Sequence, residues 1–193
     1  MTDSTDPRPH YRTALAWVGE LAARVPAGQL GDPTPCSDWD VRTLLGHLVA
    51  TVDRARVIGE GGAPFSVPSI VADVPDGGWP AALVAAQRRT EAVWADDARL
   101  DADVTVPWGR VPGRAALLGY VREALVHGWD LAVATGQGPE ADPATAAAVL
   151  AEVRTALPAE PRGGPIPFAA PVPPRPGAGP TEQLANWCGH ART

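Results

Sequence analysis

The sequence of 193 residues contains no lysine, so all 16 of its basic residues are arginine. The 22 acidic residues outnumber them and give a formal net charge of −6. The arginines are spread along the chain and form no basic run. Because phosphate binding needs clustered cations, this charge pattern argues against nucleic acid as the main partner.

Cysteine and long apolar stretches are also scarce. The two cysteines, Cys36 and Cys188, are too few for a disulfide scaffold and lack Cys-x-x-Cys spacing. Residues 1–8 are polar and contain proline, unlike the apolar core of a signal peptide. No segment approaches the roughly 20 consecutive apolar residues of a membrane span. We therefore expect a soluble, cytoplasmic protein with no membrane contact.

Apolar residues recur at steps of three and four positions in five segments, which predicts amphipathic helices. These segments are residues 8–25, 41–59, 79–94, 114–134 and 142–157. A chain of this length fits one domain, residues 1–193, with a sizeable core. The pattern predicts an all-α fold, built as a bundle of four or five main helices.

Capping residues mark where three of these helices should begin or end. Ser37, followed three positions later by Asp40, predicts a capping box before the second helix. Asp142 followed by proline predicts an N-cap and first position of the last long helix. Gly136 predicts the C-terminal cap of the helix over residues 114–134.

Proline and glycine dominate the connections. Residues 59–78 contain five glycines and three prolines and predict a long loop. The β-branched residues of 104–112, around Trp108-Gly109, predict a small hairpin or extended excursion. Nine prolines and four glycines make residues 158–180 an irregular Pro-rich tail. A short closing helix over residues 181–189 is expected to pack with this tail on the bundle.

Glu123 and His127 form a Glu-x-x-x-His pair within the expected helix 114–134. Positions i and i+4 share one helical face, and Asp130 falls on the same arc. His47 lies on the expected second helix. Between two facing helices, His47, Glu123 and His127 would supply the His2Glu set of catalytic zinc sites, which keep one position open. Nickel, iron or cobalt would also suit these ligands.

Asp130 has two possible roles at such a site, and the same residues also have an interpretation without a metal. Asp130 could accept a hydrogen bond from a ligand imidazole or act as a weaker fourth ligand. By chance, however, a Glu-x-x-x-His pair is often a solvated acid beside a satisfied histidine. His47, which neighbours Leu48 in the sequence, also fits a histidine at the edge of the core.

Two segments resemble the hallmark segments of a known family. They are Pro-Cys-Ser-Asp-Trp-Asp-Val-Arg-Thr-Leu-Leu-Gly-His-Leu-Val (35–49) and Leu-Val-His-Gly-Trp-Asp-Leu-Ala-Val-Ala-Thr-Gly-Gln (125–137). Both look like segments of the mycothiol-dependent maleylpyruvate isomerase family, a group of DinB-like proteins. Residues 167–189 resemble the Pro-rich tail and closing helix of one single-domain branch. The resemblance spans most of the chain.

The resemblance implies a DinB-like four-helix bundle with a divalent metal, and zinc is the metal we favour for this chain. The family's ligands map onto His47, Glu123 and His127. Members use the metal to activate a low-molecular-weight thiol such as mycothiol for isomerisation or S-transfer on a small electrophilic substrate. A metal-bound thiol is deprotonated and therefore strongly nucleophilic. The isomerase itself carries a further C-terminal domain that this chain is too short to contain, which leaves maleylpyruvate in question as the substrate.

Two other functions fit the same residues. A hydrolase or lyase would use metal-bound water in place of the thiol. A non-catalytic bundle would bind metal or a small ligand for regulation or storage. The expected partners are a small-molecule thiol and a substrate, and a monomer and a homodimer are both compatible with the sequence.

The remaining cysteines and histidines are secondary candidates. Cys36 lies at an expected helix N-terminus, where the dipole lowers a thiol pKa, although a small buried or loop residue is the preferred interpretation. Cys188 is expected on the apolar face of the closing helix. His10 and His190 lie near the chain ends and are expected to be exposed.

Tryptophan and arginine complete the candidate residues. Trp39 and Trp129 accompany the two ligand segments and are expected to pack the bundle rather than line a pocket. Arg110, Arg114 and Arg122 could each clamp a substrate carboxylate, because a guanidinium pairs with it through two hydrogen bonds. Surface charge is the more common role of such arginines, and the sequence favours none of the three.

Overall fold

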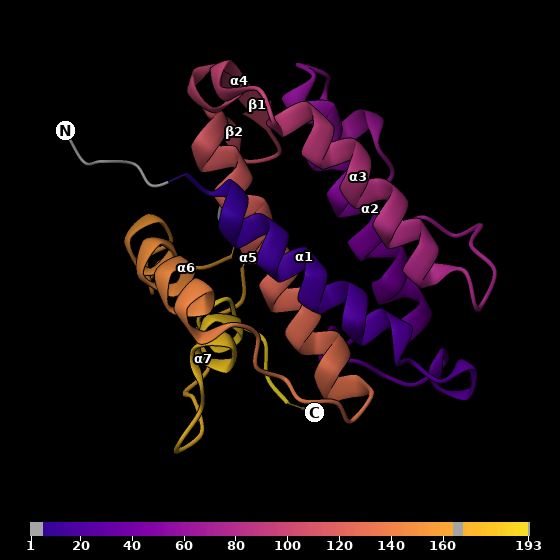
Figure 1. The fold of residues 1–193 in the computed structure, drawn as a ribbon. Helices are drawn as coiled ribbons and strands as arrows, with labels where there is room; N and C mark the ends of the chain where they lie inside the picture. The colour runs from indigo at the N-terminus through magenta and orange to yellow at the C-terminus, as the bar shows by residue number, and fades with distance from the viewer. Residues whose placement is uncertain (1–5, 164–167, 193) are drawn as a thin grey trace.

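The computed structural model describes residues 6–163 and 168–192, and this part of the chain is mostly helical (Figure 1). Its elements are α1 (Arg8–Ala23), η1 (Ala27–Gln29), α2 (Val41–Gly59), η2 (Pro64–Ser66), α3 (Trp79–Trp94), α4 (Asp97–Asp101), β1 (Asp103–Val106), β2 (Gly109–Pro112), α5 (Gly113–Ala134), α6 (Pro143–Ala156) and α7 (Pro180–Trp187). Residues 1–5 of the polar N-terminus and 164–167 of the Pro-rich tail lie outside the described residues.

Four long helices pack around the main core. Helices α1 and α2 each contact both α3 and α5. Figure 1 shows α6 and α7 on the other side of α5 from α2 and α3, and both contact α5. The expectation of a mostly helical fold is confirmed, and the all-α description needs one correction, a two-stranded sheet. None of the described helices is long and apolar enough to cross a membrane.

The sheet is the hairpin expected around Trp108. Strands β1 and β2 pair antiparallel, with Val104 opposite Val111 and Val106 opposite Gly109. Val104 and Val106 are buried, so the strand alternates between core and solvent. The turn places the Trp108 ring beside Tyr120 of α5, with ring centroids 5.9 Å apart.

The helix boundaries follow the sequence signals with some exceptions. Asp142 caps α6, because its Oδ2 accepts a hydrogen bond from the Thr145 N–H at 2.8 Å. The capping box at Ser37 was a wrong prediction. Residues 36–39 form a turn closed by the Trp39 N–H and the Cys36 carbonyl, so the helix begins later, and Asp40 itself caps α2. Helix α1 ends at Ala23, two residues before the expected Val25.

The long connection between α2 and α3 lies close against α2. The Val71 N–H donates to the Gly46 carbonyl at 3.1 Å, and a Cβ at Gly46 would lie 2.3 Å from the Val71 oxygen. Only glycine leaves room for this approach. The contact places Ser69 next to His47, which follows Gly46 in the helix.

We therefore expect Gly46→Ala to destabilise the protein by about 1–3 kcal/mol, because the new methyl group meets backbone rather than a flexible side chain. Gly19→Ala on α1 is the matched control, since nothing lies within 4 Å of its added Cβ. It should stabilise by roughly 0.5–1 kcal/mol through helix propensity. Urea unfolding measures both, and equal effects of the two substitutions would contradict the close approach.

The C-terminal helix α7 is fixed by a buried carboxylate. Glu182 is almost fully buried and accepts hydrogen bonds from Arg175 at 2.7 Å and from Arg192 at 3.0 Å. The hydrogen bond from Arg175 outweighs burial and, with the help of Arg192, lowers the pKa of Glu182 from 4.5 to about 2. The ion pair therefore connects the Pro-rich tail, α7 and the last described residues.

Glu182→Gln should destabilise the protein by about 1–3 kcal/mol near neutral pH, because the charged hydrogen bonds are lost. A carboxylate whose pKa is lower in the folded than in the unfolded protein stabilises the fold at pH values above its unfolded pKa. The full difference in stability between wild type and Glu182→Gln is therefore expected above pH 4.5, and it disappears as the pH falls toward 2. Thermal unfolding across this range measures it, with exposed Glu152→Gln on α6 as control. A pH-independent difference would refute the ion-pair account.

Candidate functional site

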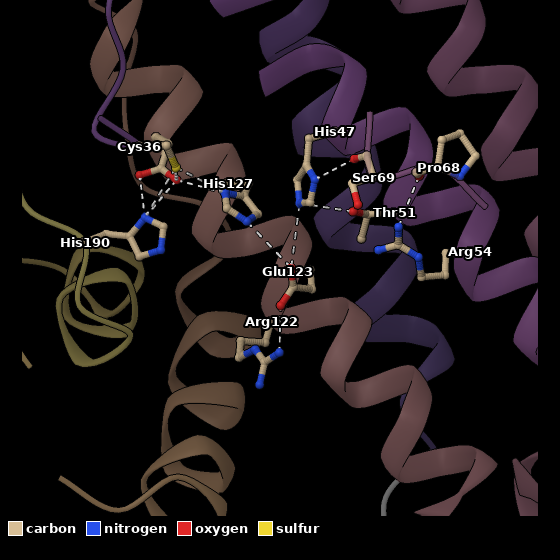
Figure 2. A network of polar contacts seen from close by, with 11 residues as sticks. Cys36, His47, Thr51, Arg54, Pro68, Ser69, Arg122, Glu123, His127 and His190 are labelled. Carbon is tan, nitrogen blue, oxygen red and sulfur yellow. Dashed lines mark hydrogen bonds and ion pairs between the residues drawn. The ribbon is translucent and has the colours of Figure 1, made fainter. Parts of the chain in front are cut away.

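The three predicted metal ligands meet between α2 and α5. Glu123 Oε2 lies 3.6 Å from His127 Nε2 and 4.0 Å from His47 Nε2. The ligand atoms of all three residues lie within 4.8 Å of one another, a spacing that one metal ion can bridge. Figure 2 shows both imidazoles turned toward Glu123. The structure thus brings together residues that are 76 positions apart in the sequence, His47 and Glu123.

Each imidazole is oriented by a partner on its other nitrogen. His47 Nδ1 lies 3.0 Å from the Ser69 carbonyl oxygen, to which it donates in the tautomer that leaves Nε2 as an acceptor. His47 Nε2 also lies 3.2 Å from the Thr51 hydroxyl, one turn along α2. His127 Nδ1 lies 3.0 Å from Asp130 Oδ2, to which it donates in the tautomer that likewise leaves Nε2 as an acceptor.

Glu123 is held as a carboxylate by its neighbours. Arg122 Nη2 donates to Glu123 Oε1 at 2.6 Å, which leaves Oε2 facing the two imidazoles. Burial alone would raise the pKa of Glu123, but the charge of Arg122 and the contacts with His127 and His47 hold the pKa well below its usual value. Glu123 is therefore ionised at neutral pH, the form that binds cations.

Asp130 is fully buried and contacts Nδ1 of His127, whereas Glu123 lies on the Nε2 side of the same ring. Asp130 accepts hydrogen bonds from His127 and from His190 Nδ1, each at 3.0 Å. Burial would raise the pKa of Asp130, yet these two hydrogen bonds lower it to about 2. Burial would likewise lower the pKa of His190, but Asp130 and Cys36 raise it to about 9. The position of Asp130 is the one expected of an acceptor for a ligand imidazole.

The predicted exposure of the two terminal histidines was wrong. The His190 side chain is 20% exposed and lies on Asp130, while His10 is half-buried beside Thr145 Oγ1 at 3.1 Å. His190 reaches the site because α7 packs on α5 and Gly189, at φ +94°, turns the chain back. Nothing in the local sequence pattern signals this docking.

Cys36 also belongs to the site. Its Sγ lies 3.3 Å from Asp130 Oδ2, 3.8 Å from His127 Nδ1 and 3.9 Å from His190 Nδ1. The expectation that Cys36 lies at a helix N-terminus was wrong, because α2 begins five residues later and is capped by Asp40. The signal that the sequence did hold is the position of Cys36 in the Pro-Cys-Ser-Asp-Trp motif.

A cavity of about 640 Å³ opens beside these residues. Trp39 lies on its wall, 4.5 Å from the His47 ring centroid, although packing was the preferred expectation for it. Trp129 is fully buried, as expected. Further lining residues come from distant parts of the chain, namely Arg54, Trp108, Tyr120, Arg122, Phe168, Cys188 and His190. The cavity therefore gives small molecules a route to the three donor atoms.

Among the three candidate arginines, only Arg122 lines the cavity. Its guanidinium carbon lies 5.5 Å from the Trp108 ring centroid and 5.0 Å from that of Phe168. Arg114 is paired with Asp101, and Arg110 with Asp103 at 3.4 Å, both away from the cavity. Sequence reasoning did not identify Arg54, which the carbonyl oxygens of Pro64 and neighbouring residues hold at the cavity.

Residues 11–132 match the sequence model of the family described as mycothiol maleylpyruvate isomerase N-terminal domain. The chain belongs to this family. The matched stretch includes His47, Glu123, His127 and Asp130, whereas His190 lies beyond it.

Two uncharacterized proteins of Mycobacterium tuberculosis, MT0763 and Rv0738, are 35% identical to this chain over 189 residues. The alignments cover 95% of this chain and 97% of each relative. The fold is also similar to two crystal structures of the mycothiol-dependent maleylpyruvate isomerase, one of a histidine-to-alanine mutant.

The TM-scores to these crystal structures are 0.53 and 0.52, and sequence identities are 14% and 15%, so this likeness concerns the fold. The match covers 64% of this chain and 58% of the isomerase chain, so the similarity spans less than two thirds of the isomerase.

The geometry predicts that the two cysteines differ in reactivity. Both cysteines border the cavity, but Cys36 is half-buried, whereas Cys188 is 3% exposed and burial raises its pKa to about 11. Iodoacetamide should therefore modify Cys36 in the native protein and Cys188 only after unfolding. Peptide mass spectrometry measures this, and Cys36→Ser should abolish native modification. Equal rates at both thiols would contradict the described burial.

Proposed function

We propose that the protein is a divalent-metal-dependent enzyme that activates a low-molecular-weight thiol of the mycothiol type. The thiol would serve isomerisation or S-transfer on a small electrophilic substrate. The observation that carries the proposal is the convergence of His47, Glu123 and His127 at a cavity of about 640 Å³. Membership of the mycothiol maleylpyruvate isomerase N-terminal domain family supports the thiol and the isomerase class.

The three donor atoms fit a metal by their chemistry. Two imidazole nitrogens and one carboxylate oxygen form the His2Glu set of catalytic zinc sites, and zinc is the metal we favour over nickel, iron and cobalt. Such an ion supplies Lewis acidity that keeps a thiol ionised at neutral pH. The DinB-like four-helix bundle proposed for the family would place these ligands on α2 and α5.

The chain's own residues prepare the site before any ligand arrives. The Ser69 carbonyl and Asp130 fix the two imidazoles, so that little side-chain freedom remains to be lost on binding. Arg122 neutralises part of the Glu123 charge and fixes its orientation. The aromatic rings of Trp39 and Phe168 line this cavity, and Trp39 packs against the His47 ring.

The same cavity offers room for a second molecule. Arg122 lies between Trp108 and Phe168, and Arg54 is held nearby, so cationic and aromatic groups face one space. A small electrophile with an anionic group would fit these walls. A cavity that reaches the donor atoms also counts against a purely structural metal site, which would be closed by protein ligands.

Metal analysis of the purified full-length protein tests the ligand assignment. We expect one zinc per chain. His47→Ala and Glu123→Ala should weaken zinc binding by at least the roughly 10–100-fold that is typical of losing a partner behind a ligand. His10→Ala is the matched control, because its imidazole contacts Thr145 outside the cavity. Full zinc retention by both site variants would sink the assignment.

Titration of the cobalt-substituted protein with mycothiol tests the thiol. The visible spectrum of cobalt reports its ligands, so mycothiol should change it in the wild-type protein. If mycothiol leaves the cobalt spectrum unchanged while the metal stays bound, the thiol proposal is rejected, and a hydrolase, a lyase or a binding protein is favoured.

A further inference from the structure

His190 comes from a part of the chain that the family match does not include. The match ends at residue 132, and His190 follows α7 in the C-terminal segment. Its ring lies in edge contact with the ring of His127, with centroids 5.5 Å apart, and it lines the same cavity as Glu123. A third imidazole-bearing segment, after those of His47 and His127, thus reaches the candidate site, and it comes from outside the family domain.

The two ring nitrogens of His190 have different surroundings. Nδ1 contacts Asp130 at 3.0 Å and lies 3.9 Å from Cys36 Sγ, while Nε2 has no hydrogen-bond partner among the described residues. Figure 2 shows Nδ1 directed at Cys36 and the other nitrogen turned away from it. A buried carboxylate thus orients the imidazole through one nitrogen, and the other nitrogen remains able to hydrogen-bond a molecule in the cavity.

Hydrogen bonds hold the backbone of the C-terminal segment in place around His190. Asn186 Nδ2 donates to the His190 carbonyl at 2.9 Å, and the His190 N–H donates to the Ala185 carbonyl at 3.0 Å. Trp187 Nε1 donates to the Leu157 carbonyl at 3.0 Å, which ties α7 to the end of α6. The His190 ring is therefore presented by a fixed backbone and not by a free chain end.

We propose that His190 is a further site residue whose Nε2 hydrogen-bonds the thiol that enters the cavity. This inference rests on the proposed function. A neutral ring accepts a hydrogen bond from S–H through Nε2, and a protonated ring donates one to a thiolate, so the contact works in both states. The ligand class is a low-molecular-weight thiol, and the C-terminal segment completes its binding site.

Two substitutions separate the two nitrogens of His190. The amide nitrogen of asparagine occupies nearly the position of Nδ1, so His190→Asn keeps a donor for Asp130 and removes the cavity nitrogen. The longer glutamine places its amide near Nε2, so His190→Gln keeps a polar group at the cavity and loses the donor for Asp130. If His190 acts only through Asp130, His190→Asn should bind the thiol more tightly than His190→Gln. If Nε2 contacts the thiol, the order should be reversed.

The experiment is calorimetric titration of zinc-loaded wild-type and variant proteins with mycothiol, alongside zinc content and thermal unfolding. We expect His190→Asn to keep its zinc and its unfolding temperature and to raise the thiol dissociation constant by about 10-fold, roughly the loss of one hydrogen bond. His190→Gln should bind the thiol more tightly than His190→Asn.

Three results would overturn the inference, and they are distinguishable. An unchanged thiol dissociation constant in His190→Asn would show that Nε2 does not contact the thiol. Weaker thiol binding by His190→Gln than by His190→Asn would make His190 a residue that acts only through Asp130. A wild-type protein that holds zinc and binds no thiol would remove the proposed thiol function itself, whatever the variants do.

Discussion

The arrangement of the site depends on one buried carboxylate, that of Asp130. It accepts hydrogen bonds from His127, His190 and Cys36, which belong to three separate parts of the chain. A fully buried charge is costly unless it is paired, and here all three partners point at it. Asp130 therefore orients the candidate ligand His127 and ties both the segment before α2 and the C-terminal segment to α5. Removing it would take the same hydrogen-bond acceptor from all three side chains.

Sequence reasoning found what local patterns encode. Apolar spacing located the long helices, and one helical face brought Glu123 and His127 together, with His47 across from them. It failed where placement depends on tertiary docking. His190 reaches Asp130 only because α7 packs on α5, and Cys36 does so because a turn precedes α2. The capping error has a local cause, because the turn between Cys36 and Trp39 delays the helix and makes Asp40 the cap in place of Ser37.

The cavity is built by the family domain together with the C-terminal segment of the chain. Residues 11–132 contain the three candidate ligands and Asp130, while Phe168 and His190 reach the cavity from beyond this domain. The relatives in Mycobacterium tuberculosis align over 97% of their length and over 95% of this chain. The isomerase of known structure matches over only 58% of its chain. In this chain, the segment ending at His190 forms part of the cavity wall.

The central claim is that two imidazoles and one carboxylate hold a metal whose open position receives a thiol from outside. X-ray absorption at the zinc edge, recorded on the purified protein before and after mycothiol is added, tests it most directly. The account predicts only nitrogen and oxygen neighbours at first and one sulfur neighbour after the thiol is added. A spectrum without sulfur in both states would contradict it, and so would sulfur present from the start, which would make Cys36 a ligand.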